Sequence, residues 1–161
     1  MTRVYQITSE NGDEYKISLS QNDWLNLSGE IKEHFGLDLI SIELVRVSGN
    51  AITSSKTLAT IEQLIADEFF GNPKAILFYY CDFLNPIPAT GKKLRPQEYR
   101  SRLFSDMLQR YISQHNLHGI SEVVTIVEGI DEPYYFHIIC RDHHLPEVQQ
   151  IASKLQADFS K

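Results

Sequence analysis

The chain of 161 residues has few of the features that mark specialised protein classes. It has two cysteines, Cys81 and Cys140, which form no CxxC motif and are predicted to be reduced core residues. Its longest apolar run, residues 75–80, is far shorter than the roughly 20 residues of a membrane-spanning helix. The N-terminal MTRVYQIT has no apolar signal segment. These shortages exclude a disulfide scaffold and a helical membrane protein, and favour a cytoplasmic location.

An excess of basic charge is also absent, because the formal net charge is −6 at pH 7. This balance argues against a generally basic nucleic-acid coat protein. The charge is unevenly distributed, however. Between Lys92 and Arg110, six cations and two acids give a local charge of +4, which leaves −10 for the remainder of the chain. The protein is therefore predicted to be polarised, with one basic segment on an acidic body.

The apolar residues follow a regular alternation of strand and helix patterns. Alternating apolar residues predict strands at 4–7, 15–19 and 39–47, with an Asn11-Gly12 turn in the first hairpin. A continuous apolar run predicts a strand at 75–81, and strands at 123–127 and 134–140 flank EGIDEP in a second predicted hairpin. The strand at 39–47 is predicted either to expose one face to solvent or to lie at an edge of the sheet. Helical spacing predicts helices at 22–35, 58–69, 96–115 and 146–159.

The order ββαβαβαββα predicts one α+β domain over residues 1–161. Its connections are short, so no linker separates two domains. We expect a mixed, largely antiparallel sheet with helices packed on it. The continuous apolar run at 75–81 predicts a central strand covered on both faces, and the first hairpin is expected at one edge.

The cations gather where the loop after this central strand enters the third predicted helix at Pro96. Helix N-termini carry unpaired N–H groups and a partial positive charge, which attract phosphates and carboxylates. We therefore predict an anion-binding surface formed by Lys92, Lys93, Arg95, Arg102 and Arg110. An acidic protein surface, a nucleotide-like ligand and nucleic acid are all compatible partners. The alternative, that these side chains are simply solvated, stays open.

The TGKK sequence within this loop does not form a Walker phosphate loop. Pro86 stands where GxxxxGK[ST] requires its first glycine, and Lys93 replaces the hydroxyl that would hold magnesium. Nucleotide hydrolysis by this motif is therefore not predicted.

Arg100 falls on the apolar face of the third predicted helix, where a guanidinium needs a partner. Asp82, at the end of the preceding strand, is the nearest candidate, so we predict a structural Arg100–Asp82 ion pair. An alternative hypothesis is an enzyme acting on a phosphate-bearing substrate in a cleft formed by Asp82, Arg100 and His137.

A second group of chemically capable residues lies on the last predicted strand and directly after it. It comprises His137, Cys140, Arg141, Asp142, His143 and His144. Their spacing matches no paired-ligand metal pattern, and strand alternation places His137 and Cys140 on opposite faces. We therefore predict no metal and no cofactor, and interpret 142–144 as turn and capping residues.

The sequence thus favours a non-enzymatic binding module that uses residues 92–110 to engage an anionic partner. Two alternatives remain: the phosphate-substrate enzyme, and a structural homo-oligomer without a small-molecule ligand, joined through exposed aromatic residues.

Overall fold

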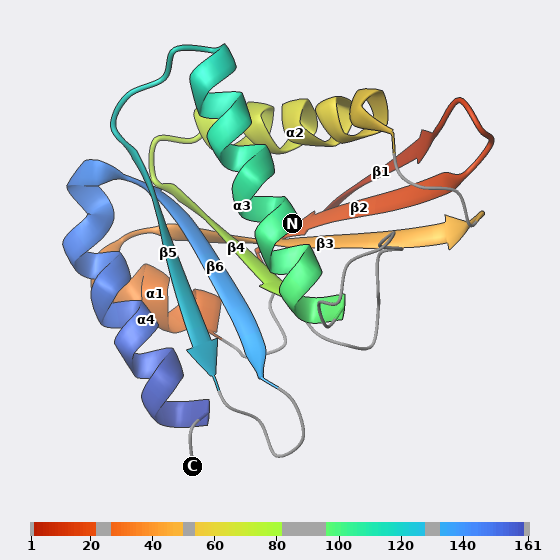
Figure 1. The fold of residues 1–161 in the computed structure, drawn as a ribbon. Helices are drawn as coiled ribbons and strands as arrows, with labels where there is room; N and C mark the ends of the chain where they lie inside the picture. The colour runs from red at the N-terminus through yellow and green to blue at the C-terminus, as the bar shows by residue number, and fades with distance from the viewer. Residues whose placement is uncertain (1, 22–26, 50–53, 82–95, 128–132, 160–161) are drawn as a thin grey trace.

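The computed structural model describes residues 2–21, 27–49, 54–81, 96–127 and 133–159 (Figure 1). The strands are β1 Thr2–Thr8, β2 Glu14–Ser20, β3 Asp38–Ser48, β4 Ala75–Cys81, β5 Ile120–Val127 and β6 Tyr134–Arg141. The helices are α1 Leu27–Phe35, α2 Ser55–Phe70, α3 Pro96–Gln114 and α4 Leu145–Phe159, with a short 3₁₀ turn, η1, at Asp142–His144. The predicted α+β class and order of elements are confirmed.

The described strands form one mixed sheet of order β1-β2-β3-β4-β6-β5. Within it β3 and β4 form the single parallel pair, because α2 carries the chain across between them. The predicted central place of β4 and edge place of the first hairpin are confirmed. An edge place for β3 is wrong. The described pairing with β4 ends at Ile42, whereas β3 continues to Ser48, and the residues after Ile42 are the more exposed part of the strand.

Local sequence signals account for the helix and turn boundaries. The Ser54 Oγ accepts a hydrogen bond of 3.2 Å from the Thr57 N–H and caps α2, which ends at Gly71. Pro96 is the first residue of α3, as predicted. Gly12 adopts φ +83° in the β1–β2 turn, a conformation that glycine tolerates best. None of the helices in the described ranges is both long and apolar enough to span a membrane.

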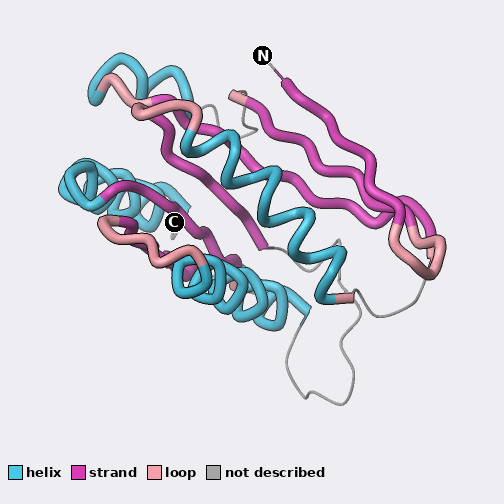
Figure 2. The backbone as a smooth tube through the Cα atoms, turned by 90° about the horizontal axis from the view of Figure 1, so that it is seen from above, coloured by secondary structure: helices cyan, strands magenta, loops and turns pink. Residues whose placement is uncertain are grey.

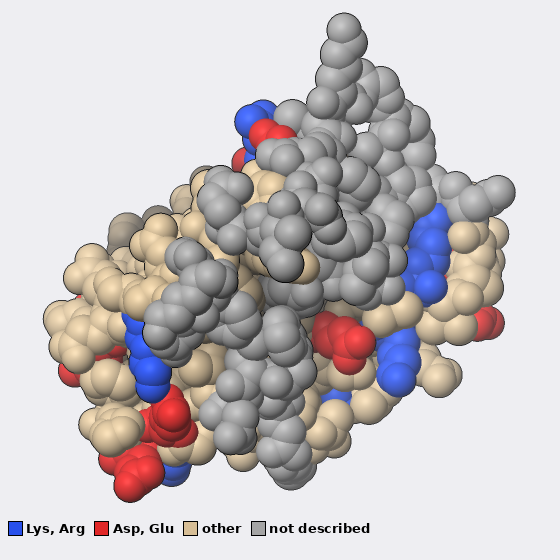
Figure 3. All heavy atoms as spheres, turned by 90° about the horizontal axis from the view of Figure 1, so that it is seen from below, with Lys and Arg blue, Asp and Glu red and all other residues tan. Residues whose placement is uncertain are grey.

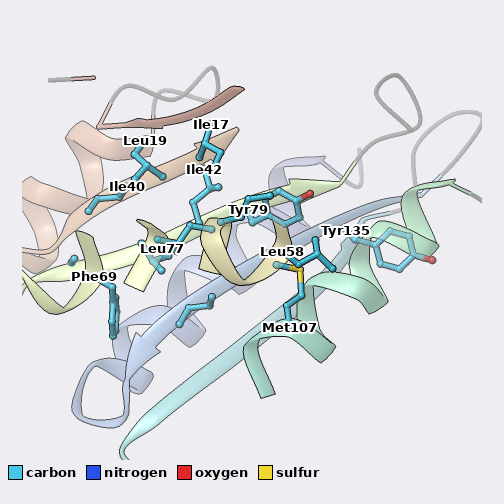
Figure 4. Close-up of a cluster of buried hydrophobic side chains, with 14 residues drawn as sticks. Ile17, Leu19, Ile40, Ile42, Leu58, Phe69, Leu77, Tyr79, Met107 and Tyr135 are labelled. Carbon is cyan, nitrogen blue, oxygen red and sulfur yellow. The ribbon is translucent and has the colours of Figure 1, made fainter. Parts of the chain in front are cut away.

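The sheet separates two apolar cores. On one face α2 and α3 cover a cluster that includes Ile61, Phe69, Leu77 and Met107 (Figure 4). On the other face α1 and α4 cover a second cluster around Phe136 and its neighbours. Figure 2 shows the twisted sheet with helices on both sides. Alternate residues of β4 and β6 enter opposite cores, which explains why both strands are apolar almost throughout.

Candidate functional site

The predicted anion-binding cations that the structure describes both lie on α3 and both contact carboxylates. The side chain of Arg102 is 65% exposed, and its Nη2 lies 3.2 Å from Glu98 Oε1 one turn away. Arg110 Nη2 lies 2.6 Å from Glu62 Oε1 on α2. Four further predicted residues lie outside the described ranges: Asp82, Lys92, Lys93 and Arg95. On the face shown in Figure 3, the described acidic and basic side chains are interspersed rather than gathered by sign.

Arg100 lies inside the protein, as its helical position suggested. It is 4% exposed, and its Nη2 donates to Tyr79 Oη at 3.1 Å and to the Leu44 carbonyl at 3.4 Å. Because Asp82 is not described, the Arg100–Asp82 pair stays a prediction. The contacts that are described fasten the first turns of α3 to β4 and β3.

A buried hydrogen-bonded chain lies beside Arg100, between α3, β6 and β5. His137 on β6 is 0% exposed. Its Nε2 lies 2.7 Å from Ser101 Oγ on α3, and its Nδ1 lies 3.1 Å from Glu122 Oε2 on β5. The second carboxylate oxygen of Glu122 accepts a hydrogen bond of 2.8 Å from Ser105 Oγ. Four side chains from three elements therefore satisfy one another.

The carboxylate of Glu122 determines which atoms donate and which accept in these hydrogen bonds. An ionised Glu122 can only accept, so His137 Nδ1 carries the proton that it shares with Oε2. In the neutral ring, Nε2 is then the acceptor for the Ser101 hydroxyl. This is the arrangement of a hydroxyl, an imidazole base and an orienting carboxylate that activates a serine nucleophile in hydrolases.

Aromatic rings and helix α3 enclose the imidazole. The ring of Phe104 lies 5.3 Å from the His137 ring centroid in an edge contact, and Tyr79 lies 6.2 Å away. Ser101 itself is 6% exposed, and the cavity beside Arg100 and Phe104 has a volume of only about 20 Å³. In the described conformation the burial of Ser101 leaves little room for a substrate carbonyl at its Oγ. These hydrogen-bonded side chains therefore connect α3 to β5 and β6 within the core.

Comparison with known proteins gives no functional inference. No protein-family model matches the chain, and the searches of curated proteins and of solved structures found no match. The function must therefore be argued from the geometry alone.

The sequence reasoning identified His137 but missed its partners, Ser101, Ser105 and Glu122. Each partner is a polar residue that points inward from its helix or strand, and this exception to the apolar pattern of the inward faces was the available signal. The two serines are one helical turn apart, so Ser101 reaches the His137 ring and Ser105 reaches the Glu122 carboxylate beside it. What the sequence did not show is that β5, α3 and β6 meet at this point.

The second predicted group of residues does not converge. Cys140 belongs to the core under α1 and α4, whereas His137 faces α3, as strand alternation predicted. Burial raises the pKa of the Cys140 thiol to about 11, which disfavours the thiolate needed for nucleophilic attack. Among the described residues no group of His, Cys, Asp and Glu side chains could hold a metal ion.

Arg141, at the end of β6, has a structural place. Its Nη2 donates to the Phe69 carbonyl at 2.9 Å, and its Nη1 donates to the carbonyls of Asn72 and Pro73 at 3.2 Å each. Its guanidinium carbon lies 4.3 Å from the Phe69 ring centroid. Arg141 therefore caps the C-terminal end of α2, where unpaired carbonyls and the negative end of the helix dipole favour a cation.

Two larger hollows lie away from the His137 chain. An apolar one of about 60 Å³ lies between α2 and α3 and includes Phe70 and Leu108 in its lining. A polar one of about 300 Å³ lies between the sheet and the end of α2, and the Arg3–Glu68 ion pair of 2.8 Å lies in its wall. Among the described residues neither cavity is lined by more than one cation, in contrast to the sequence of residues 92–95, which carries three cations.

Proposed function

We propose that this protein is a binding module that engages an anionic partner through residues 92–95 and the N-terminal end of α3. One observation carries the proposal: α3 begins at Pro96, immediately after Lys92, Lys93 and Arg95. The unpaired N–H groups of the first turn and the positive end of the helix dipole therefore adjoin the densest run of cations in the chain.

The attachment of α3 supports this proposal, because binding is stronger at a site that is already rigid. Arg100 and Ser101, one turn into the helix, are 4% and 6% exposed and hydrogen-bonded to the sheet. The N-terminal end of α3 is thus held at a fixed place. The ion pairs of Arg102 and Arg110 make these two residues secondary contributors. The acidic remainder of the chain would orient an approaching anion toward the basic end.

The salt dependence of binding tests this proposal. We expect a single-stranded oligonucleotide to bind with an affinity that falls as salt rises. The triple variant Lys92→Gln, Lys93→Gln, Arg95→Gln should flatten the slope of log K against log salt by about 2, since each neutralised contact contributes ~0.7. Fluorescence anisotropy with labelled oligonucleotide, with ATP and poly-glutamate as competitors, measures the slope and the class of partner.

The matched control is the double variant Arg102→Gln, Arg110→Gln, which removes two cations that already contact carboxylates. It should change the slope by less per charge than the triple variant. Absence of binding to all three anions, or binding that does not depend on salt, would contradict the proposed function.

A second candidate function is hydrolysis of an ester at Ser101, with His137 as base and Glu122 as its orienting group. The hydrogen-bonded order of these three side chains favours it, and their burial places it second. It shares only His137 with the phosphate-substrate alternative.

A serine-directed fluorophosphonate probe separates the two candidate functions. Because Ser101 is 6% exposed, we expect no covalent labelling of the native protein. Intact-mass spectrometry after incubation provides the readout, with the Ser101→Ala variant as control. Labelling that is present in the native protein and lost in that variant would favour the hydrolase.

A further inference from the structure

β5 forms one edge of the sheet, and no other described strand pairs with its outer side. Its eight residues, ISEVVTIV, contain no proline, glycine, lysine or arginine. Natural proteins usually protect an edge strand with proline, with charged side chains, with a bulge or with a covering element, because an open edge accepts another strand. The pairing of β5 with β6 also runs without a register shift from Ile120 to Val127, so no bulge bends it away.

The outward backbone groups of β5 can be assigned from its ladder with β6. The Asp142 N–H donates to the Gly119 carbonyl at 2.8 Å, one position before the Ile120↔Arg141 pair. Antiparallel strands alternate strictly between residues that bond to the partner and residues that bond away from it. The odd-numbered residues therefore bond to β6. The N–H and C=O groups that point outward belong to Ile120, Glu122, Val124 and Ile126.

The side chains along this edge are apolar where they are exposed. Val124 and Ile126 are 42% and 47% exposed, and Val124 lies opposite His137, which places both on the α3 side of the sheet. The single charged residue of the strand, Glu122, is turned inward to His137 and Ser105. The opposite edge differs, because β1 carries Arg3, whose side chain is 51% exposed and paired with Glu68.

We propose that β5 is a docking edge for β5 of a second copy of this chain, paired antiparallel about a two-fold axis at Thr125. In this register Val124 lies opposite the partner's Ile126, and the two residues exchange their outward hydrogen bonds. Val123 lies opposite the partner's Val127. The interaction goes beyond the proposed anion binding and does not depend on it.

The self-complementary sequence selects a second copy over an unrelated peptide. About the axis at Thr125 every cross-strand pair from position 123 to position 127 is apolar or threonine with threonine, which are favourable pairs in sheets. Within these five positions no like charges face one another, although the chain as a whole carries −6. A two-fold axis between identical strands also closes the assembly at two copies. Because strand pairing alone buries less surface than a standard interface, the dimer should dissociate on dilution.

Sedimentation velocity of the full chain over a series of concentrations tests the pairing. Val124→Pro removes an outward N–H without breaking the ladder to β6, so the variant should fold and remain monomeric. Val124→Glu and Val4→Glu place the same charge on the two opposite edges, at residues that are 42% and 50% exposed. The first should abolish the dimer and the second should leave it intact. A native protein that is monomeric throughout, a dimer that survives Val124→Glu, or a dimer lost in Val4→Glu would overturn the proposal.

Cysteine cross-linking tests the register. A mixture of Val124→Cys and Ile126→Cys chains should form a disulfide-linked heterodimer under mild oxidation, since these positions are directly opposed. Each variant alone should cross-link far less. Equal cross-linking of Val124→Cys with itself would overturn the axis at Thr125.

Discussion

Replacing Arg141 by methionine should lower the free energy of unfolding by about 2–4 kcal/mol, from the loss of charge-assisted hydrogen bonds and of a cation–π contact. Methionine keeps the apolar stem of the side chain but removes every donor. The carbonyls of Phe69 and Pro73 then lose the guanidinium that caps the end of α2. The same change removes the contact at 4.3 Å with the Phe69 ring.

Urea denaturation followed by circular dichroism measures this loss. Arg141→Lys should recover only part of it, because an ammonium has no planar fork to reach several carbonyls together. Arg102→Met is the matched control: its side chain is 65% exposed and makes one helical ion pair, so it should cost less than about 0.5 kcal/mol. Equal stability of the Arg141→Met and Arg102→Met variants would show that the contacts of Arg141 at the end of α2 do not contribute to the free energy of unfolding.

Replacing Glu122 by alanine should destabilise the protein by about 2–4 kcal/mol, because the buried His137 and the partly buried Ser105 lose their acceptor. His137 is 0% exposed, so water cannot easily take the place of the carboxylate at Nδ1. The Ser105 hydroxyl loses the same partner. Glu122→Gln keeps one acceptor oxygen and a similar shape, and should therefore cost less than Glu122→Ala.

Glu43→Ala is the control for this experiment, since Glu43 is an exposed glutamate on a strand of the same sheet. Its effect should stay within about 0.5 kcal/mol. The double variant His137→Phe, Glu122→Met replaces both polar partners by apolar groups, and we expect it to be less destabilised than Glu122→Ala. A Glu122→Ala variant as stable as Glu43→Ala would mean that the hydrogen bonds of Glu122 with His137 and Ser105 do not stabilise the protein.

The sequence predicted the elements well because their signals are local. Pro96 and the apolar spacing after it define α3, and the unbroken apolar run from Ala75 defines β4. The burial of Arg100 followed from its angle on a helical wheel. These features depend on residues a few positions apart, so no knowledge of the sheet was needed.

The candidate site depended on contacts that no local pattern encodes. The predicted hairpin of β5 and β6 brings Glu122 and His137 together, but Ser101 reaches His137 only because α3 crosses that pair. Likewise the capping role of Arg141 follows from the place of β6 beside β4, which brings the end of one strand to the start of the other. Strand order is a non-local property, and it was the missing information.

The parallel pair β3–β4 divides the backbone of the sheet into two halves that are each continuous in sequence. One half is the meander of β1, β2 and β3, and the other contains β4, β6 and β5. Within the sheet only the five residue pairs from Asp38↔Ala75 to Ile42↔Tyr79 join them. Loop closure costs more for pairs that are farther apart in the chain, and the β4–β6 ladder pairs Leu77 with Ile139, whereas the β3–β4 ladder pairs the closer residues Asp38 and Ala75. The β3–β4 ladder is thus a short joint between two halves that also share one apolar core, and the β4–β6 ladder is the pairing with the larger loop-closure cost.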